Sequence, residues 1–272
     1  MGILNTTPDS FSDGGDHLDA ATAIAAGERM LADGAHILDI GGESTRPNAT
    51  PVSPAEEQSR VLPVIAALAR HGAVISIDTR NATTMARALD AGATIVNDVS
   101  ALTHDPAALA LVASSACPVV LMHMRGAPAT MKRLAVYTDV ATEVLAELRA
   151  RRDAALAAGI LLSNIMLDPG LGFAKTAEHT IELLRRLPLL QELGCPLLVG
   201  ISRKSTIGML ANEPDPRRLA PGSLAAALFA ITRGASVVRV HDVHETVQAL
   251  RIWQGLSEPD PPRPRLSEAE RI

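Results

Sequence analysis

The sequence predicts an α/β protein that folds as a single-domain (β/α)8 TIM barrel. Its 272 residues, 47% of them hydrophobic, are enough for one large domain with a sizeable core. Short apolar runs alternate with longer helical stretches, and eight such pairs occur along the chain. The alternative is a doubly wound sheet, which usually has fewer units and a G-x-G-x-x-G motif after its first strand. No such motif follows Gly2–Leu4.

Eight runs rich in β-branched and aliphatic residues are expected to form the strands, because nearly continuous apolar runs are typical of a parallel sheet covered by helices. These runs are Gly2–Leu4, His36–Ile40, Val74–Ile77, Thr94–Val96, Pro118–Met122, Asn164–Leu167, Pro196–Ile201 and Ser236–Val240.

The stretches between these runs are rich in Ala, Leu, Glu and Arg and predict helices. They are Ala20–Ala32, Pro54–Arg70, Ala82–Ala91, Pro106–Ser114, Val140–Ala158, Glu178–Leu193, Leu219–Thr232 and Val243–Gln254. Ser53, Pro54 and Glu56 predict an N-cap with a capping box. Six glycines are placed to end a helix just before a strand: Gly34, Gly72, Gly92, Gly159, Gly194 and Gly234.

Composition excludes several classes of protein. The net charge of −5 argues against a broad nucleic-acid surface. The sequence contains no long uninterrupted apolar run, so a membrane-spanning helix is not expected. It does not begin with charged residues followed by an apolar run, so a signal peptide is not expected either. Cys117 and Cys195 are too few for a disulfide framework or a zinc site, so two buried thiols in the reducing cytoplasm are expected.

Aromatic residues are scarce, with three Phe, one Tyr and one Trp. The core is therefore expected to be aliphatic, with Phe229 and Trp253 as its aromatic members. Phe11 and Phe173 instead fall in Gly- and Pro-rich segments, which suggests a role in a binding site. The barrel is expected to span residues 1–256, and the Pro-rich, charged residues 257–272 are expected to form a flexible tail.

Every expected strand ends in polar residues. The ends are Asn5, Asp39, Asp78, Asn97-Asp98, His123 to Arg125, Asp168, Ser202 to Ser205, and Arg239 to Asp242. Asp98 and Asp105 are interpreted as turn formers and helix caps. In a parallel barrel the strand ends share one face, so the set predicts an active site there.

The side chains at this face form two chemical groups. Asp78, Asn97 and Asp168 suit a flat heterocycle with amino and ring N–H donors, since a carboxylate accepts two hydrogen bonds in one plane. Lys204 could reach the heterocycle or a product carboxylate. A second, donor-rich set suits phosphate or pyrophosphate, with backbone N–H groups of the Gly41-Gly42 turn: Ser44, Thr45, Arg46, Arg239 and His241. Asn5, Asp9 and Asp13 could hold Mg²⁺ against that anion.

Eight segments resemble the dihydropteroate synthase family in order along the chain. They are NTTPDSFSDGG from Asn5, DIGGESTRP from Asp39, Asp78-Thr79, Asn97-Asp98, MHMRGAP from Met122, DPGLGFAK from Asp168, SRKS from Ser202 and RVHDV from Arg239. The match extends from Gly2 to about Gln254. The resemblance implies a transferase that joins 4-aminobenzoate to 6-hydroxymethyl-7,8-dihydropterin diphosphate, giving 7,8-dihydropteroate and pyrophosphate.

The resemblance also implies residue roles. Asp78, Asn97, Asp168 and Lys204 would bind the pterin. Asn5 would ligate Mg²⁺, and Asn5, Thr45, Arg239 and His241 would hold the diphosphate. The first two loops, with Asp9, Phe11, Asp13, Arg46 and Pro47, would close over the site. The aminobenzoate would be framed by Phe11, Pro47, Phe173, Lys204 and Ser205, and the catalytic set would be Asp9, Asp13, Lys204, Arg239 and His241.

The implied path is SN1-like: pyrophosphate leaves first, and the arylamine attacks a pterin methylene cation. A homodimer is also implied. The sequence departs from the family pattern at Thr6, Leu171 and Ala174, where Val, Phe and Gly are common. Family members also usually carry extra residues before the first strand, in which Met1 lies here.

Two alternatives stay open. A methyltetrahydrofolate-binding methyltransferase barrel shares the Asp and Asn set but does not need the diphosphate site. A paralogue of the synthase could bind pterin without turnover.

Overall fold

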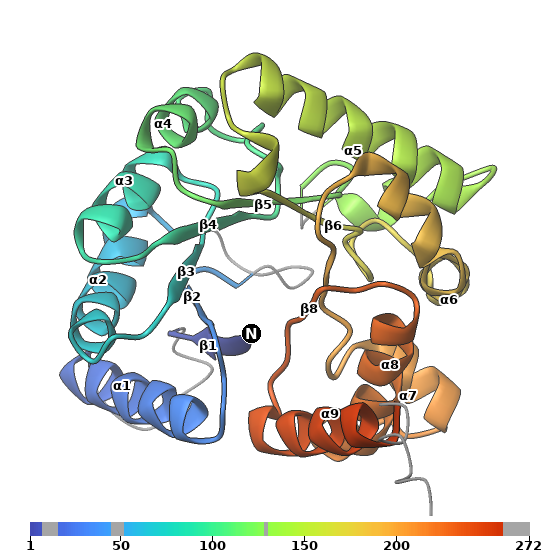
Figure 1. Ribbon diagram of the computed structural model, residues 1–272. Helices are drawn as coiled ribbons and strands as arrows, with labels where there is room; N and C mark the ends of the chain where they lie inside the picture. The colour runs from blue at the N-terminus through green and yellow to red at the C-terminus, as the bar shows by residue number, and fades with distance from the viewer. Residues whose placement is uncertain (7–15, 45–51, 128–129, 258–272) are drawn as a thin grey trace, which may run out of the picture.

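The computed structural model describes residues 1–6, 16–44, 52–127 and 130–257. Its parallel strands lie inside a ring of helices (Figure 1). The strands are β1 Gly2–Asn5, β2 Leu38–Gly41, β3 Ile75–Asp78, β4 Ile95–Asp98, β5 Val119–Met122, β6 Ile165–Asp168, β7 Leu198–Val199 and β8 Val237–Val238. The helices are α1 Asp16–Ala32, α2 Pro54–Arg70, α3 Ala82–Asp90, α4 Ala108–Ser115, α5 Val140–Ala157, α6 Ala177–Arg185, α7 Ser205–Ala211, α8 Ala220–Thr232 and α9 Val243–Ser257.

The strands close into a barrel. Strands β1 to β6 pair in sequence order, and β7 pairs with β8. A parallel bridge between Leu167 and Leu197 joins β6 to the start of β7. A second bridge, between Gly2 and Val240, joins β1 to the end of β8. The predicted (β/α)8 barrel is confirmed.

The barrel core is aliphatic, as expected. Leu38, Ile40, Ile75, Ile77 and Val96 are fully buried, because the strands are covered by helices on one face and by each other on the inside. Phe229 and Trp253 were expected in this core, but Phe229 is 37% exposed and Trp253 is only half-buried. Helix α8 buries Ser223, Ala227 and Ala230, and Phe229 does not fall on that inner face of the helix.

The predicted helix signals are largely confirmed. All six glycines placed at helix ends adopt positive φ. The Ser53 side chain caps α2 by accepting from the Glu56 backbone N–H at 3.2 Å. The second half of the predicted capping box is not formed, because the Glu56 carboxylate pairs with Arg60, one turn along the helix. Asp98 and Asp105 accept backbone N–H groups in turns, as interpreted from the sequence.

Strands β7 and β8 are shorter than the expected runs Pro196–Ile201 and Ser236–Val240, and three helices differ most from expectation. The helix expected to run to Leu193 ends at Arg185 and is followed by a 3₁₀ helix over Leu187–Leu193, because Pro188 has no N–H to continue the α-helical pattern. Helix α7 was not predicted. Helix α9 extends to Ser257, the first residue of the expected tail, and 258–272 lie outside the described residues.

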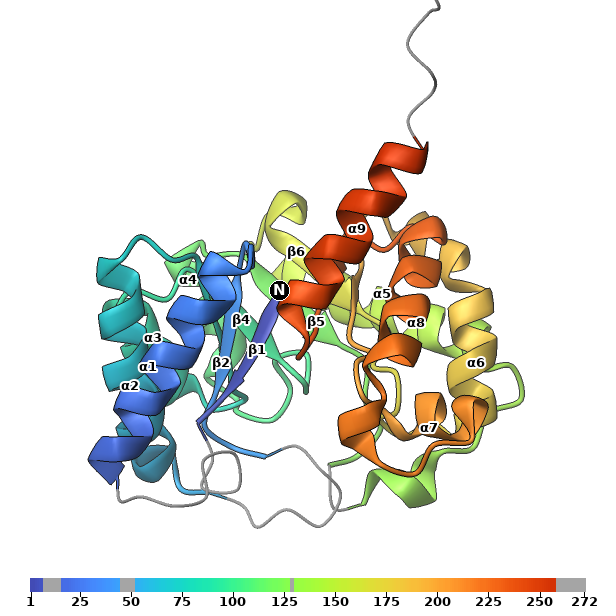
Figure 2. The same ribbon diagram turned by 90° about the horizontal axis from the view of Figure 1, so that it is seen from below.

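Seen from the side, the strands run together between the helices α1 to α3 and the helices α6 and α8 (Figure 2). Their parallel pairing brings all carboxyl ends to one end of the barrel. Within the described part of the chain, no helix is both long enough and apolar enough to cross a membrane.

Candidate active site

Arg239 connects the strand ends across the barrel mouth. It follows β8, and its Nε donates to Asp39 of β2 at 2.5 Å while a terminal nitrogen donates to Asp78 of β3 at 2.8 Å. Burial opposes the guanidinium charge, but the carboxylates of Asp39 and Asp78 outweigh it and raise the Arg239 pKa. The side chains predicted to bind the heterocycle and those predicted to bind the anion therefore meet at Arg239.

The pKa of the Asp78 carboxyl is strongly shifted. Its side chain is 13% exposed. Burial raises its pKa to about 7, opposed by Arg239, while Asp39, Glu57 and Asp98 add repulsion. A carboxyl that titrates near neutrality in a cleft is typical of a functional site.

Asp39 is the main site residue missing from the predicted set. It is fully buried, and its Oδ2 accepts from both Arg239 and the Asn97 amide, the latter at 3.0 Å. It thereby orients one predicted pterin ligand and one predicted diphosphate ligand. Sequence did carry a signal, because a carboxylate inside the apolar run Leu38–Gly41 is buried and needs a partner.

Asp168, Lys204 and Phe173 come together at the ends of β6 and β7. Burial raises the Asp168 pKa, and the Lys204 charge opposes this shift. Burial lowers the Lys204 pKa to about 8, opposed by Asp168. Lys204 Nζ donates to the Leu171 carbonyl and lies 4.8 Å from the centre of the Phe173 ring. Ser205, the next residue along, is exposed at the start of α7.

His241 contacts Ser202, which follows β7. Its Nδ1 is 3.0 Å from Ser202 Oγ, and its backbone N–H donates to the same oxygen at 3.2 Å. Because Ser202 Oγ accepts from the backbone, its own proton is directed to Nδ1, which favours the tautomer with hydrogen on Nε2. Nearby, Arg203 pairs with Asp242 and ties the two strand ends together.

Asn5 ends β1 and pairs in register with Gly41 of β2. Its amide oxygen is a ligand type that Mg²⁺ accepts. Among the described residues, no three His, Cys, Asp or Glu side chains gather as a metal cluster. A single amide oxygen from Asn5 fits Mg²⁺, because this ion binds through one or two protein oxygens when a substrate phosphate supplies the others.

Six predicted site residues lie outside the described residues: Asp9, Phe11, Asp13, Thr45, Arg46 and Pro47. The structure brings Asp78 and Asn97 together with Arg239, and Asp168 and Phe173 together with Lys204. The charge of Arg239 also acts on Asp168 and Lys204, which connects the two groups. Neither cysteine lies in this set; Cys195 is buried as expected, whereas Cys117 is only half-buried.

Comparison with known proteins identifies the family. Residues 1–241 match the pterin binding enzymes. A dihydropteroate synthase of Synechocystis sp. is 50% identical over 257 residues, which cover 94% of this chain and 89% of the relative. The structure of Xanthomonas albilineans dihydropteroate synthase with 4-aminobenzoic acid matches with a TM-score of 0.90 and 48% identity, over 95% of this chain and 93% of that one. A second structure from that organism, in complex with 7,8-dihydropteroate, matches with a TM-score of 0.87 and 45% identity, over 95% and 94%. The sequence of this chain and its barrel fold both match the same family, and this chain belongs to the pterin binding enzyme family.

Proposed function

We propose that this chain is a dihydropteroate synthase. It condenses 6-hydroxymethyl-7,8-dihydropterin diphosphate with 4-aminobenzoate to give 7,8-dihydropteroate and pyrophosphate. The observation that carries the proposal is the pairing of Arg239 with Asp39 and Asp78. This pairing joins the donor-rich set expected to bind diphosphate to the acidic set expected to bind the pterin. The relatives named dihydropteroate synthase support the same reaction.

The described residues divide the work by chemistry. Asp78 and Asp168 accept hydrogen bonds from the amino and ring N–H groups of the pterin, and Asn97, held by Asp39, completes that set. Arg239 and His241 donate to the diphosphate. Lys204 and Phe173, in contact with each other, frame the aminobenzoate together with Ser205.

The charges favour an SN1-like path. Cationic donors stabilise the charge that develops on departing pyrophosphate. The carboxylates of Asp78 and Asp168 stabilise the pterin methylene cation that remains. The aminobenzoate nitrogen then attacks, and it needs no strong general base because its proton can leave after the bond forms.

Mg²⁺ belongs to the proposal through Asn5. When bound there with the diphosphate, the ion would neutralise charge on the leaving group. Titration calorimetry with pyrophosphate tests this: Mg²⁺ should tighten binding to the native protein and should have a smaller effect on Asn5→Ala. An equal effect on both proteins would remove Asn5 from the metal site.

The direct test mixes purified protein, the dihydropterin diphosphate, Mg²⁺ and 4-aminobenzoate, and measures pyrophosphate and dihydropteroate. Both products should form in equal amounts, and Asp168→Asn should reduce the rate at least tenfold. Pterin binding without product would instead favour the non-catalytic paralogue. Methyltetrahydrofolate binding without binding of the diphosphate would favour the methyltransferase-type barrel.

A homodimer in the cytoplasm is part of the same proposal. Five large apolar side chains on α7, α8 and α9 are exposed: Met209, Leu210, Phe229, Ile252 and Leu256. These three helices lie side by side (Figure 1). Exposed apolar side chains of this kind suit contact with a second copy of the chain. Two free cysteines fit a reducing compartment.

A further inference from the structure

Lys175 is a buried cation outside the proposed substrate contacts. The chain has three lysines, of which Lys132 is exposed and Lys204 belongs to the site described above. Lys175 is 9% exposed. Its ammonium donates to the Gly170 carbonyl at 3.1 Å and the Phe173 carbonyl at 3.0 Å, and Nζ lies 2.8 Å from His123 Nδ1. In the protonated form, the three N–H donors of the ammonium thus meet three acceptors.

Two of those acceptors belong to the loop between β6 and α6, which therefore folds around the Lys175 ammonium. The loop is left-handed at three positions, with φ of +63° at Gly170, +78° at Gly172 and +47° at Ala174. A Cβ on Gly170 would lie 1.9 Å from the His123 carbonyl oxygen, so the loop packs directly on the end of β5. Glycine adopts this conformation freely, whereas Ala174 is strained there and keeps its conformation only because its surroundings hold it.

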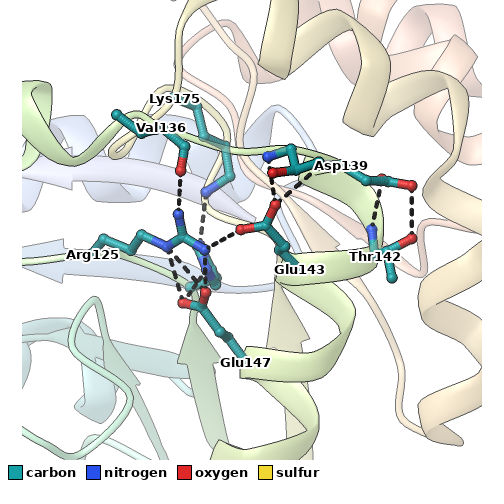
Figure 3. Close-up of polar contacts among 9 residues, drawn as sticks. Arg125, Val136, Asp139, Thr142, Glu143, Glu147 and Lys175 are labelled. Atoms are coloured by element: carbon teal, nitrogen blue, oxygen red, sulfur yellow. Dashed lines mark hydrogen bonds and ion pairs between the residues drawn. The ribbon is translucent and has the colours of Figure 1, made fainter.

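His123 links the ammonium to a chain of charges on α5. It is 3% exposed, and burial lowers its pKa, while the hydrogen bond with Glu147 opposes that shift. Nδ1 faces Lys175 as an acceptor, which places the ring proton on Nε2, 3.0 Å from a Glu147 oxygen. Glu147 also accepts from Arg125, which reaches Glu143 at 2.8 Å (Figure 3).

The loop that Lys175 holds carries groups of the active site. Asp168 begins it and accepts from the Gly170 N–H at 2.7 Å. The Leu171 carbonyl accepts from Lys204, and the Phe173 ring faces the same ammonium. Lys175 donates to the backbone carbonyl of Phe173 in the same loop.

We propose that Lys175 and His123 are positioning residues for the aminobenzoate side of the reaction. The Nδ1 atom of His123 orients the Lys175 ammonium, and the ammonium sets the loop so that Phe173 and Lys204 frame the arylamine. This role rests on the proposed function. Binding of the pterin depends less on the contact between Lys175 and His123, because Asp168 is also fixed by strand pairing in β6.

The cost of keeping this cation buried supports a specific role. Burial lowers the Lys175 pKa to about 7; Asp168 and Glu147 oppose that shift, and Lys204 and Arg125 add to it. A methionine would fill the same space without that electrostatic cost.

Three variants test the proposal, with Lys132→Met as the matched surface control. Lys175→Met should raise the KM for 4-aminobenzoate at least fivefold and change the KM for the pterin diphosphate less than twofold. His123→Asn keeps an acceptor at the place of Nδ1, and should stay close to the native values. His123→Gln keeps the contact with Glu147 but loses that acceptor, and should behave like Lys175→Met.

Hydrogen exchange of the free protein gives a readout that does not need turnover. The amides of Gly170 and Phe173 should exchange at least tenfold faster in Lys175→Met and His123→Gln, with α2 unchanged. Unchanged loop exchange, an equal rise of both KM values, or His123→Asn as the more damaged variant would each overturn the proposal. If the native protein forms no dihydropteroate, the proposed function fails, while loop exchange still decides whether these residues position the loop.

Discussion

At the scale of single residues, the site depends on buried charges that are held by one another. Arg239 forms ion pairs with both Asp39 and Asp78, and its positive charge offsets the repulsion between the two carboxylates. Asp39 in turn holds Asn97. A substitution at any of these positions therefore acts on its partners as well as on a substrate.

Arg239→Ala should weaken diphosphate binding at least tenfold and also shift the pH dependence of bare pterin binding. The Asp78 pKa is about 7 because burial raises it and Arg239 opposes the rise. Pterin affinity should therefore fall as the pH drops through about 7 and the carboxylate gains a proton. Without Arg239 the pKa rises further, so the same loss should begin at a higher pH.

Titration calorimetry with the bare pterin and with its diphosphate, between pH 5 and 9, measures both effects. Asp78→Asn is the control, since it should abolish the pH-dependent step. Identical pH profiles for Arg239→Ala and the native protein would show that Arg239 does not act on Asp78.

Ala174 offers a second test at this scale, because it combines a left-handed φ of +47° with 1% exposure. Replacement by Gly relieves about 1–2 kcal/mol of backbone strain, but loses about 0.8 kcal/mol of methyl burial and adds chain entropy to the unfolded state. Ala174→Gly should thus change the free energy of unfolding by less than about 1 kcal/mol. Ala174→Val should lower it by about 2 kcal/mol or more, since a β-branched residue resists this conformation.

Urea unfolding at constant m-value compares the two variants. Equal stability of Ala174→Val and the native protein would mean that the loop relaxes to another conformation.

At the scale of elements, side-chain pairs fix the connections at the carboxyl ends of the strands. Glu43 follows β2 and forms a two-point ion pair with Arg80, which follows β3, at 3.0 Å for each contact. Glu43 also accepts from the Val52 N–H at 3.3 Å. The Glu43 carboxylate thus links the two ends of the β2–α2 connection, and it also links this connection to the residue that follows β3. Residues 45–51 lie between these two anchors and outside the described residues.

Arg80→Met should lower the free energy of unfolding by about 2 kcal/mol, because it leaves a nearly buried carboxylate without its charged partner. Denaturant unfolding measures this loss. In the double variant with Glu43→Gln, part of the loss should be recovered, and simple additivity of the two changes would contradict a direct pair.

At the scale of the whole molecule, barrel closure and the outer helices set separate properties. Closure through Gly2 and Val240 brings β8 next to β1 and so places Arg239 within reach of β2 and β3. The outer face of α7, α8 and α9 carries apolar side chains that the barrel itself does not bury.

The proposed dimer predicts that charge on this face separates the subunits. Leu210→Glu and Ile252→Glu, at 65% and 62% exposed positions, should each shift the protein from dimer to monomer in sedimentation velocity. Leu161→Glu is the matched control, since Leu161 is 64% exposed but lies before β6. A native protein that sediments as a monomer would remove the dimer from the proposal.

Much of this molecule follows from the sequence by itself. Apolar runs of strand length alternating with helical stretches determine a parallel barrel, and the helix ends follow from local chemistry at Ser53 and the glycines. The polar strand ends determine which face carries the site, since parallel strands share one direction. Local rules failed where a single residue interrupts a pattern, as Pro188 does after α6.

Only the tertiary structure decided which polar residues are partners. Arg239 meets Asp39 across 200 positions and Asp78 across 161, and Lys175 meets His123 across 52. Spacing along the chain carries no information on such pairs, because a buried charge takes whichever opposite charge or lone pair barrel closure brings within reach. The sequence therefore determined the face and the chemistry of the site, and the closed barrel decided its connections.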